Sequence, residues 1–392
     1  MPESTLRLAE DAPDPLAGRS LPGWLYHDPG FFALEVERVL RPAAQIVCHL
    51  SDIAVPGAWI AFETLGERIL VVRQRDGGVR ALANVCRHRG ARIADGGSGC
   101  ARRFTCPYHG WTYDTEGRLI GVPMREDYDD LEPDRLGLVR FPAEIWRGFV
   151  FVRLGERGGP CVAEMMAPYE EEIAPYRFED LRAIGRVTVR PRPVNWKAIA
   201  DNYSDGLHIG VAHPGLTRLF GRDYQVEAGA HVDRMAGRLT ERPSNVASER
   251  AYQALLPPVP HLPIEAQRLW LYYKLWPNLA FDIYPDQVDF MQFLPVSPTA
   301  TLIREVSYAL PDGRREMKAA RYLNWRINRR VNAEDTQLVA RVQQGMETPS
   351  YRPGPLGRSE VCLRSFADRL RRIIPEARLP HPPQPARRSH GA

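Results

Sequence analysis

Cys86-Arg87-His88-Arg89-Gly90 and Cys106-Pro107-Tyr108-His109-Gly110-Trp111 are the two stretches that decide the fold. Each pairs one cysteine with one histidine, and 17 residues separate the two motifs' His88 and Cys106. Two thiolates can hold one iron of a [2Fe–2S] cluster while two imidazoles hold the other. A structural zinc site would use the same residue types, but zinc fingers pair Cys with Cys and His with His. The pattern therefore predicts an iron–sulfur cluster held by Cys86, His88, Cys106 and His109.

The sequence around these loops is typical of a small antiparallel β domain. Short β-branched or aromatic runs, as at 59–62, 69–72 and 149–152, alternate with Gly, Asp and Pro turns. We expect residues 46–155 to form this domain. The preceding residues 1–45 contain a helical pattern near 30–40 and are expected to pack on the remainder of the chain.

Composition and charge limit the class of protein. The 392 residues are 44% hydrophobic and 26% charged, which supports a large folded core in one elaborate domain or two. Lys and Arg (52) nearly balance Asp and Glu (48), and the basic residues are dispersed, so nucleic acid is not an expected partner. No apolar run is long enough for a membrane span, and the acidic, proline-containing start differs from a signal peptide. We expect a cytoplasmic protein without membrane association.

A second possible metal site follows at Asn195–Pro214. A line of apolar residues there has helical spacing, and Asp201, Asp205 and His208 fall on a second line at i, i+4 and i+7. On a regular helix His208 and His213 would lie about 140° apart, too far for one metal. We therefore expect the helix to widen or end between them.

The third ligand of this site is predicted on a distant helix. Two imidazoles and one carboxylate form the facial triad that binds non-haem Fe(II). Asp335 lies within an apolar line on the helix expected at 315–346, and a buried carboxylate requires a cationic partner, either a metal or a core arginine. Its neighbour Glu334 points more toward Arg330 and Arg341 and is expected at the surface.

The rest of the chain reads as an α+β domain at 156–378. A helical pattern covers 161–181, and aromatic strand patterns cover 269–276 and 279–294, the latter interrupted by Pro285-Asp286. The last residues, 379–392, combine proline with positive charge and are expected to be disordered.

Together these motifs resemble those of Rieske non-haem iron oxygenase α subunits. The family's two cluster loops are matched by Cys86–Gly90 and Cys106–Trp111. Its mononuclear-iron motif is matched by Asn195-Trp196-Lys197, Asp201-Asn202, Asp205, His208 and His213-Pro214, and its third-ligand helix by Glu334-Asp335, Gln343 and Gly345. Ala91 and Tyr108 replace the extra cysteines of respiratory Rieske proteins. The resemblance runs from about Trp24 to Pro375.

The resemblance implies the fold and the cofactors. It implies a small antiparallel β Rieske domain followed by a helix-grip catalytic domain with an antiparallel sheet, an α+β architecture. The cofactors implied are a [2Fe–2S] Rieske cluster and a mononuclear Fe(II) on His208, His213 and Asp335. It further implies a head-to-tail homotrimer in which Asp205 joins His208 to His109 of the next subunit, with Asn202 in the same catalytic motif.

The resemblance also implies activation of O₂ with electrons from outside the chain. No nucleotide-binding loop is found, so a separate NAD(P)H-dependent reductase is expected, with or without a ferredoxin. Five arginines crowd the cluster loops and would suit an acidic electron donor: Arg87, Arg89, Arg92, Arg102 and Arg103. Whether a β subunit joins the trimer stays open.

Three interpretations of function remain. The first is hydroxylation of an aromatic substrate, as in aromatic hydrocarbon catabolism, in a cavity lined by Trp270, Tyr272, Tyr273, Trp276, Phe281, Tyr284, Phe290, Met291 and Phe293. The second, ranked slightly lower, is oxidative N-demethylation or hydroxylation of a betaine-like quaternary ammonium compound, held by an aromatic cage with Asp282, Asp286 or Asp289. The third is an electron-transfer iron–sulfur protein whose second metal site is vestigial.

Overall fold

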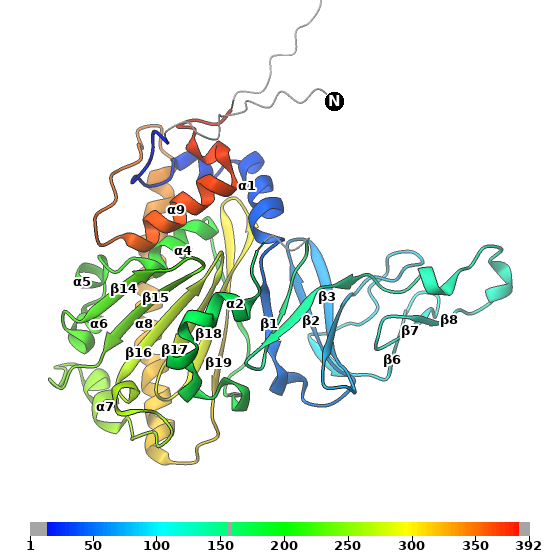
Figure 1. The fold of residues 1–392 in the computed structure, drawn as a ribbon, viewed down its shortest axis with the longest axis horizontal. Coiled ribbons are helices and arrows are strands. Elements are labelled where there is room, and N and C mark those ends of the chain that lie inside the picture. The colour runs from blue at the N-terminus through cyan, green and yellow to red at the C-terminus, as the bar shows by residue number, and fades with distance from the viewer. Residues whose placement is uncertain (1–13, 156–158, 384–392) are drawn as a thin grey trace, which may run out of the picture.

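The computed structural model describes residues 14–155 and 159–383, which form a β-rich part and a larger α+β part (Figure 1). The β-rich part extends to the right in Figure 1, and the α+β part lies to the left. Of the tail predicted at 379–392, residues 384–392 lie outside the described chain. Leu379 is ordered, since its carbonyl accepts a hydrogen bond from Trp24 Nε1 at 2.9 Å.

The β-rich part contains three antiparallel sheets. Their orders are β5-β2-β3-β4-β9, β6-β7-β8 and β1-β11-β10. The strands are β1 Gln45–His49, β2 Ala58–Thr64, β3 Glu67–Arg73, β4 Val79–Ala83, β5 Ser98–Cys100, β6 Arg103–Thr105, β7 Thr112–Asp114, β8 Leu119–Gly121, β9 Arg140–Phe141, β10 Ala143–Trp146 and β11 Phe149–Val152.

Alternating side chains on two strands build three hydrophobic cores. On β3, Leu70 and Val72 pack in the cluster that holds the two motif cysteines, while Ile69 and Val71 face the opposite core. On β11, Phe149 and Phe151 pack against the sheet of the α+β part, whereas Val150 faces back into the β-rich part. The sheet β1-β11-β10 is therefore the joint between the two parts.

The α+β part is built on one large antiparallel sheet. Its order is β12-β19-β18-β17-β16-β15-β14, and β13 also pairs with β19. The strands are β12 Arg182–Ala183, β13 Thr188–Arg192, β14 Tyr224–Ala228, β15 Val232–Arg238, β16 Leu269–Leu275, β17 Leu279–Ile283, β18 Val288–Ser297 and β19 Ala300–Ala309. The aromatic strands predicted at 269–276 and 279–294 are confirmed, including the break at Pro285-Asp286.

Helices cover both faces of this sheet. In Figure 1, α2 lies in front of the sheet and α8 runs behind it. The α-helices are α1 Pro29–Glu35, α2 Val162–Met166, α3 Glu170–Ile173, α4 Trp196–Ser204, α5 Ile209–Ala212, α6 Pro214–Phe220, α7 Ala247–Leu255, α8 Arg315–Met346 and α9 Val361–Ile373. The helix predicted at 315–346 is confirmed, whereas the pattern at 161–181 forms only α2, α3 and short 3₁₀ turns. None of the helices in the described part of the chain is long and apolar enough to cross a membrane.

The N-terminal segment packs on the α+β part. Trp24, Tyr26 and Phe31 share a hydrophobic cluster with residues of α4 and α9. Lys197 Nζ on α4 forms an ion pair with Glu35 Oε1 at 2.7 Å, and both side chains are 0% exposed. Burial lowers the pKa of Lys197 and raises that of Glu35, and each partner opposes the effect on the other. This ion pair locks α1 onto the helix that leads into the second predicted metal site.

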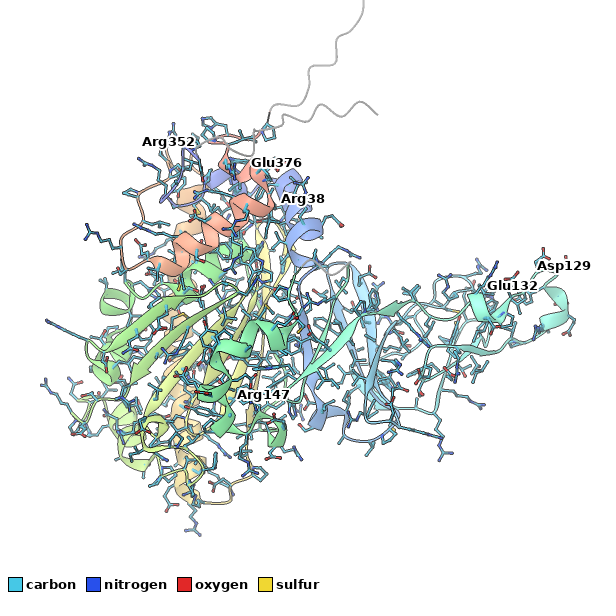
Figure 2. All side chains as sticks on the ribbon, in the orientation of Figure 1. Arg38, Asp129, Glu132, Arg147, Arg352 and Glu376 are labelled. Atoms are coloured by element: carbon cyan, nitrogen blue, oxygen red, sulfur yellow. The ribbon has the colours of Figure 1, made fainter. Side chains whose placement is uncertain are left out.

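An exposed ion pair links two segments at the same end of the molecule. Arg38, in the turn Val36–Leu40 after α1, meets Glu376 of the turn Pro375–Arg378 at 3.4 Å, and Figure 2 shows both at the edge of the α+β part. Their side chains are 44% and 34% exposed, so solvent screens this attraction.

Candidate metal centres and substrate pocket

The two Cys–His loops have the same backbone form. The N–H groups of Cys86 and Cys106 each donate to the carbonyl five residues later, both at 2.8 Å. The N–H groups of Gly90 and Gly110 each donate back to the cysteine carbonyl, at 3.0 and 3.1 Å. Both glycines have φ of +74°, in the left-handed region that side chains disfavour. The two loops therefore have the same turn conformation, and they face each other.

The four predicted cluster ligands meet between these turns. The ring centroids of His88 and His109 are 4.6 Å apart, and both cysteines are buried in one hydrophobic cluster. The hydroxyl of Tyr113 lies 3.4 Å from Cys86 Sγ. Burial raises the pKa of the Cys106 thiol, so a bound metal would be needed to keep it as a thiolate.

The donor set fits a [2Fe–2S] cluster. His88 Nδ1 is buried and has no hydrogen-bond partner among the described residues, and the His88 ring stacks on Trp111 with centroids 4.9 Å apart. A buried nitrogen without a partner is unfavourable unless a metal takes its lone pair. Two thiols and two imidazoles on facing turns match a cluster with its cysteines on one iron and its histidines on the other.

The helix predicted to widen or end between His208 and His213 ends earlier than expected. α4 stops at Ser204, and Asp205 is extended with φ of −83° and ψ of 114°. Asp205 Oδ1 accepts the N–H of Leu207 at 2.8 Å, a local hydrogen bond that competes with the helical one. The predicted helical line of Asp201, Asp205 and His208 is therefore wrong, since Asp205 and His208 lie beyond α4.

The early break changes the setting of the histidines. His208 precedes the single turn α5 and His213 follows it, so the two rings turn toward each other. Asp201 stays on α4 and accepts a hydrogen bond from Tyr26 OH at 2.9 Å, away from the histidines.

Three predicted ligands converge from α5 and α8. His208 Nε2 and His213 Nε2 are 3.0 Å apart, and Asp335 Oδ1 lies 3.6 and 3.0 Å from them. Ligands about 2.1 Å from one metal in neighbouring octahedral positions are about 3.0 Å apart. The three atoms therefore occupy one triangular face on which a divalent cation fits, with its remaining positions open.

A carboxylate lies behind each imidazole. Asp205 Oδ2 is 3.2 Å from His208 Nδ1, and Glu334 Oε2 is 2.9 Å from His213 Nδ1. The hydrogen bond to Glu334 fixes the His213 ring and its tautomer, whereas Asp205 lies within ion-pair distance of His208 Nδ1 without hydrogen-bond geometry. Both Nε2 atoms are directed at the metal position. The surface position predicted for Glu334 is wrong: Glu334 is partly buried and spans from His213 to Arg330, 3.2 Å from its second oxygen.

Asn202 completes the surroundings of Asp335. Its Nδ2 donates to Asp335 Oδ1 at 2.8 Å, so this oxygen meets an amide as well as the two imidazoles. Burial favours the neutral acid, but hydrogen bonds from His208 and His213 outweigh it and lower the pKa of Asp335. Burial likewise opposes charge on His208, yet Asp205 and Asp335 raise its pKa to about 9. The site is thus built to hold positive charge beside Asp335.

A pocket adjoins this triad, between α4, α8 and one face of the large sheet. Tyr272, Asp282 and Asp289 stand directly opposite one another on β16, β17 and β18, and all three line the pocket. Since side chains alternate along a strand, the intervening Phe281 and Phe290 point into the core on the other face. The cavity measures about 110 Å³, below the roughly 300–1,000 Å³ common for drug-sized ligands, which favours a compact substrate.

The pocket is acidic and rich in tyrosine. Tyr203 donates a short hydrogen bond to Asp282, and Gln287 Nε2 donates to Asp289 at 3.0 Å. Burial raises the pKa of Asp282 to about 7 and that of Asp289 well above its usual value. The ring of Tyr272 lies 6.5 Å from that of Tyr203 and 6.3 Å from that of Tyr224.

Most of the aromatic strand residues do not line this pocket. Of the nine predicted, only Tyr272 and Met291 do. Of the three candidate cage acids, Asp282 and Asp289 do, whereas Asp286 accepts a hydrogen bond from Tyr252 and lines a different cavity. Tyr203 and Tyr224 were missed, although Tyr203 lies one residue from Asn202 on α4.

Two family models match the chain. Residues 43–138 match the Rieske [2Fe–2S] domain, and residues 178–376 match the ring hydroxylating α subunit (catalytic domain). The first covers both Cys–His loops, and the second covers the triad and the pocket.

Similar proteins of known activity include monooxygenase subunits. The oxygenase subunit of carnitine monooxygenase from Acinetobacter pittii is 29% identical over 88% of this chain and 90% of its own length. The chloroplastic choline monooxygenase of Atriplex hortensis is 30% identical over 88% of this chain and 74% of its own. A crystal structure of a quaternary ammonium Rieske monooxygenase with L-carnitine superposes with a TM-score of 0.75, at 25% identity, over 93% of this chain and 97% of that one.

Proposed function

The chain belongs to the ring-hydroxylating α subunits of the Rieske oxygenases, and we propose that it oxidises a small quaternary ammonium compound. As a member it is an oxidoreductase that uses a [2Fe–2S] cluster, a mononuclear iron, O₂ and electrons from a separate reductase. What is proposed is the substrate class, the ligand residues, and the assembly.

We assign the metal ligands from the donor geometry. Cys86 and Cys106 would hold one iron of the cluster, and His88 and His109 the other. The mononuclear iron would lie on the triangular face of His208, His213 and Asp335, where atoms 3.0–3.6 Å apart converge. When bound, the cluster supplies an electron and the mononuclear iron activates O₂. An intact triad with its supporting carboxylates argues against a vestigial site.

One observation carries the substrate class: Tyr272, Asp282 and Asp289 lie in register on one wall of the pocket, beside Tyr203 and Tyr224. Like charges directly opposite on neighbouring strands repel, and a cation between them removes the repulsion. A trimethylammonium group cannot donate a hydrogen bond but is attracted to carboxylates and to the faces of aromatic rings. A neutral arene would leave both carboxyl groups without a cationic partner, so ring hydroxylation ranks second.

The reaction would place one oxygen atom in a C–H bond next to the nitrogen. The other atom of O₂ leaves as water, with two electrons from the reductase and two protons. An N-hydroxymethyl product then releases formaldehyde, a proton and the demethylated amine, whereas hydroxylation of the chain carbon next to the nitrogen breaks that C–N bond and releases an aldehyde, a proton and the tertiary amine. The chain's part is to hold the ammonium group in the Tyr–Asp wall while the iron ligands stay fixed by Asp205 and Glu334.

We further propose a head-to-tail homotrimer with Asp205 at its interface. The cluster loops, near β6 and β7, and the triad, at α5, lie at opposite ends of one chain in Figure 1. Electrons would therefore pass from the cluster of one subunit to the iron of the next. Asp205, in contact with His208, would receive His109 of the partner subunit and join the two centres.

The electron donor would dock at the cluster loops. All five arginines predicted for this face are exposed, and Arg89 stacks over Tyr108 at 5.2 Å from the ring centroid. An NAD(P)H-dependent reductase or ferredoxin with an acidic surface would complement them. The described cysteines are all free thiols, which supports a reducing, cytoplasmic setting.

Metal analysis and a substrate comparison test these proposals. Anaerobically purified protein should contain about three iron and two acid-labile sulfides per chain, with a Rieske-type EPR signal after dithionite reduction. With a surrogate reductase, methylated amines and aromatic acids of matched size should then be compared by product mass and formaldehyde release. Two iron without a third would indicate an electron carrier. Hydroxylated arenes without demethylated amines would overturn the substrate class.

A further inference from the structure

The pocket side of the large sheet changes charge from one edge to the other. Asp282 and Asp289 lie on the inner strands β17 and β18, as described above. On β13, at the sheet edge, Arg190 and Arg192 stand opposite Ile303 and Thr301 of β19, and the strand register places them on the pocket face. The sheet therefore presents carboxyl groups deep in the pocket and guanidinium groups at its rim.

The two arginines have different partners. Arg190 forms a short ion pair with Glu305, so their charges cancel. Arg192 also lines the pocket, and among the described residues its guanidinium donates only to the neighbouring Pro191 carbonyl, at 3.0 Å. No carboxylate of the described chain lies within ion-pair distance of it. Burial lowers the pKa of Arg192, and the nearby positive charge of Arg190 lowers it further. An anion bound beside Arg192 would raise this pKa again.

These positions suit a ligand with two charged ends. A guanidinium has five N–H donors in a fork that matches a carboxylate, and one of them is used here. An ammonium group between Asp282, Asp289 and the tyrosines would leave a short chain directed toward the rim. A negative group there would meet Arg192, the one pocket cation without a carboxylate partner among the described residues.

We infer that Arg192 binds a carboxylate of the substrate, so that the enzyme selects zwitterionic betaines over quaternary ammonium alcohols. The inference rests on the proposed function, because it assumes that the ammonium end occupies the Tyr–Asp wall. It adds a specificity-determining residue at the opposite end, on a strand that contributes no metal ligand.

Matched pairs of probes test this assignment in the holoenzyme with a surrogate reductase. Glycine betaine and γ-butyrobetaine are each compared with their methyl esters, in which a neutral ester replaces the carboxylate, and choline is included as the alcohol. The measured quantity is the ratio of kcat/KM for each zwitterion to that for its ester, supported by anaerobic calorimetric titration of each probe. Arg192→Gln removes the charge, Arg192→Lys keeps it, and Arg186→Gln changes an exposed arginine outside the pocket.

Arg192→Gln should lower the zwitterion-to-ester ratio about 10- to 100-fold, the effect of losing one charge-assisted contact. Arg192→Lys should restore part of it, and Arg186→Gln should leave the ratio at the wild-type value. An equal fall for zwitterion and ester, with iron content intact, would overturn the role of Arg192. Failure of the proposed function would appear in the wild type alone, as neither binding nor turnover of any ammonium probe, and would overturn both.

Discussion

The two proposed metal centres of this chain are built in opposite ways. The cluster site uses two neighbouring loops that repeat the same hydrogen bonds, each closed on itself by a glycine. The triad instead needs a helix that ends early, a single turn between two histidines, and a carboxylate on a helix far along the chain. Local geometry thus makes the first site, whereas packing makes the second. Changes in the α+β part should therefore disturb the mononuclear iron and spare the cluster.

The largest effect is expected from removing one ligand of each centre. His213→Ala should abolish turnover and reduce iron from about three to about two per chain with sulfide unchanged, because only the triad loses a donor. Cys106→Ser should remove the sulfide and the Rieske EPR signal while one iron remains. Both are measured by metal and sulfide analysis. If His213→Ala also lost the sulfide, the two centres would not be independent.

Asp205→Ala should separate electron transfer from metal binding. Turnover should fall more than about 100-fold, because the carboxylate 3.2 Å from His208 Nδ1 both orients that ring and would join the two centres. Metal content should stay at about three iron per chain. Single-turnover oxidation of the reduced cluster by O₂ is the measurement, and wild-type rates or loss of iron would each contradict the bridging role.

Lys197→Met tests the packing that positions α4. Removing one partner of the fully buried ion pair with Glu35 should lower the free energy of unfolding by about 3–5 kcal/mol. Arg38→Gln breaks an exposed pair with Glu376 and should cost less than about 1 kcal/mol. Urea unfolding, followed by tryptophan fluorescence, gives both values. Equal losses would show that burial does not govern these pairs.

Glu334→Gln should weaken iron binding at the triad about 10-fold, with the cluster unaffected. The amide can still accept a hydrogen bond from His213 Nδ1 but lacks the charge that makes the imidazole a stronger ligand. Competition with an Fe(II) chelator measures the affinity. Arg330→Gln serves as the control, since it removes the outer partner of Glu334 and leaves the His213 contact in place.

The smallest effect is a pH dependence of substrate binding. Burial raises the pKa of Asp282 to about 7, so this acid becomes neutral as pH falls through that value and loses its attraction for a cation. KM for a quaternary ammonium substrate should rise severalfold from pH 8 to pH 6, and Asp282→Asn should flatten the profile. The stability of the unliganded fold depends on pH in the opposite direction. The raised pKa of Asp282 stabilises the fold at low pH, and that stability is lost as pH rises through about 7. A KM independent of pH would place the cation elsewhere.

Sequence reasoning identified what is local or strongly periodic. The Cys–His loops are complete within a few residues, and the alternation of strands 269–276 and 279–294 and the long helix Arg315–Met346 follow from side-chain spacing. The α+β class and the membership in the Rieske oxygenases followed from the motifs. The metal-ligand roles stay predictions, although the three triad donors lie together as expected.

The errors have a common physical cause. A helical pattern runs through Asp205, but the Asp205 carboxylate accepts the N–H of Leu207, which competes with the helical hydrogen bond, and α4 ends at Ser204. Glu334 contacts Arg330 in its own helix, whereas tertiary packing brings His213 to its other oxygen. The aromatic residues of these strands alternate between the pocket face and the core face of the sheet. Only the register of β16 to β19 shows which face each residue occupies.

The alternating faces of β16 to β19 have a consequence for engineering. One face belongs to the interior, and the other carries Tyr272, Asp282, Asp289, Met291 and Glu305 into the pocket. A mutational library confined to Tyr272, Asp282, Asp289 and Glu305 would explore new substrates while the core side chains of the same strands, Met291 included, stay in place. Because side chains alternate between the two faces, positions open to change in substrate choice and positions needed for folding alternate along the same strands.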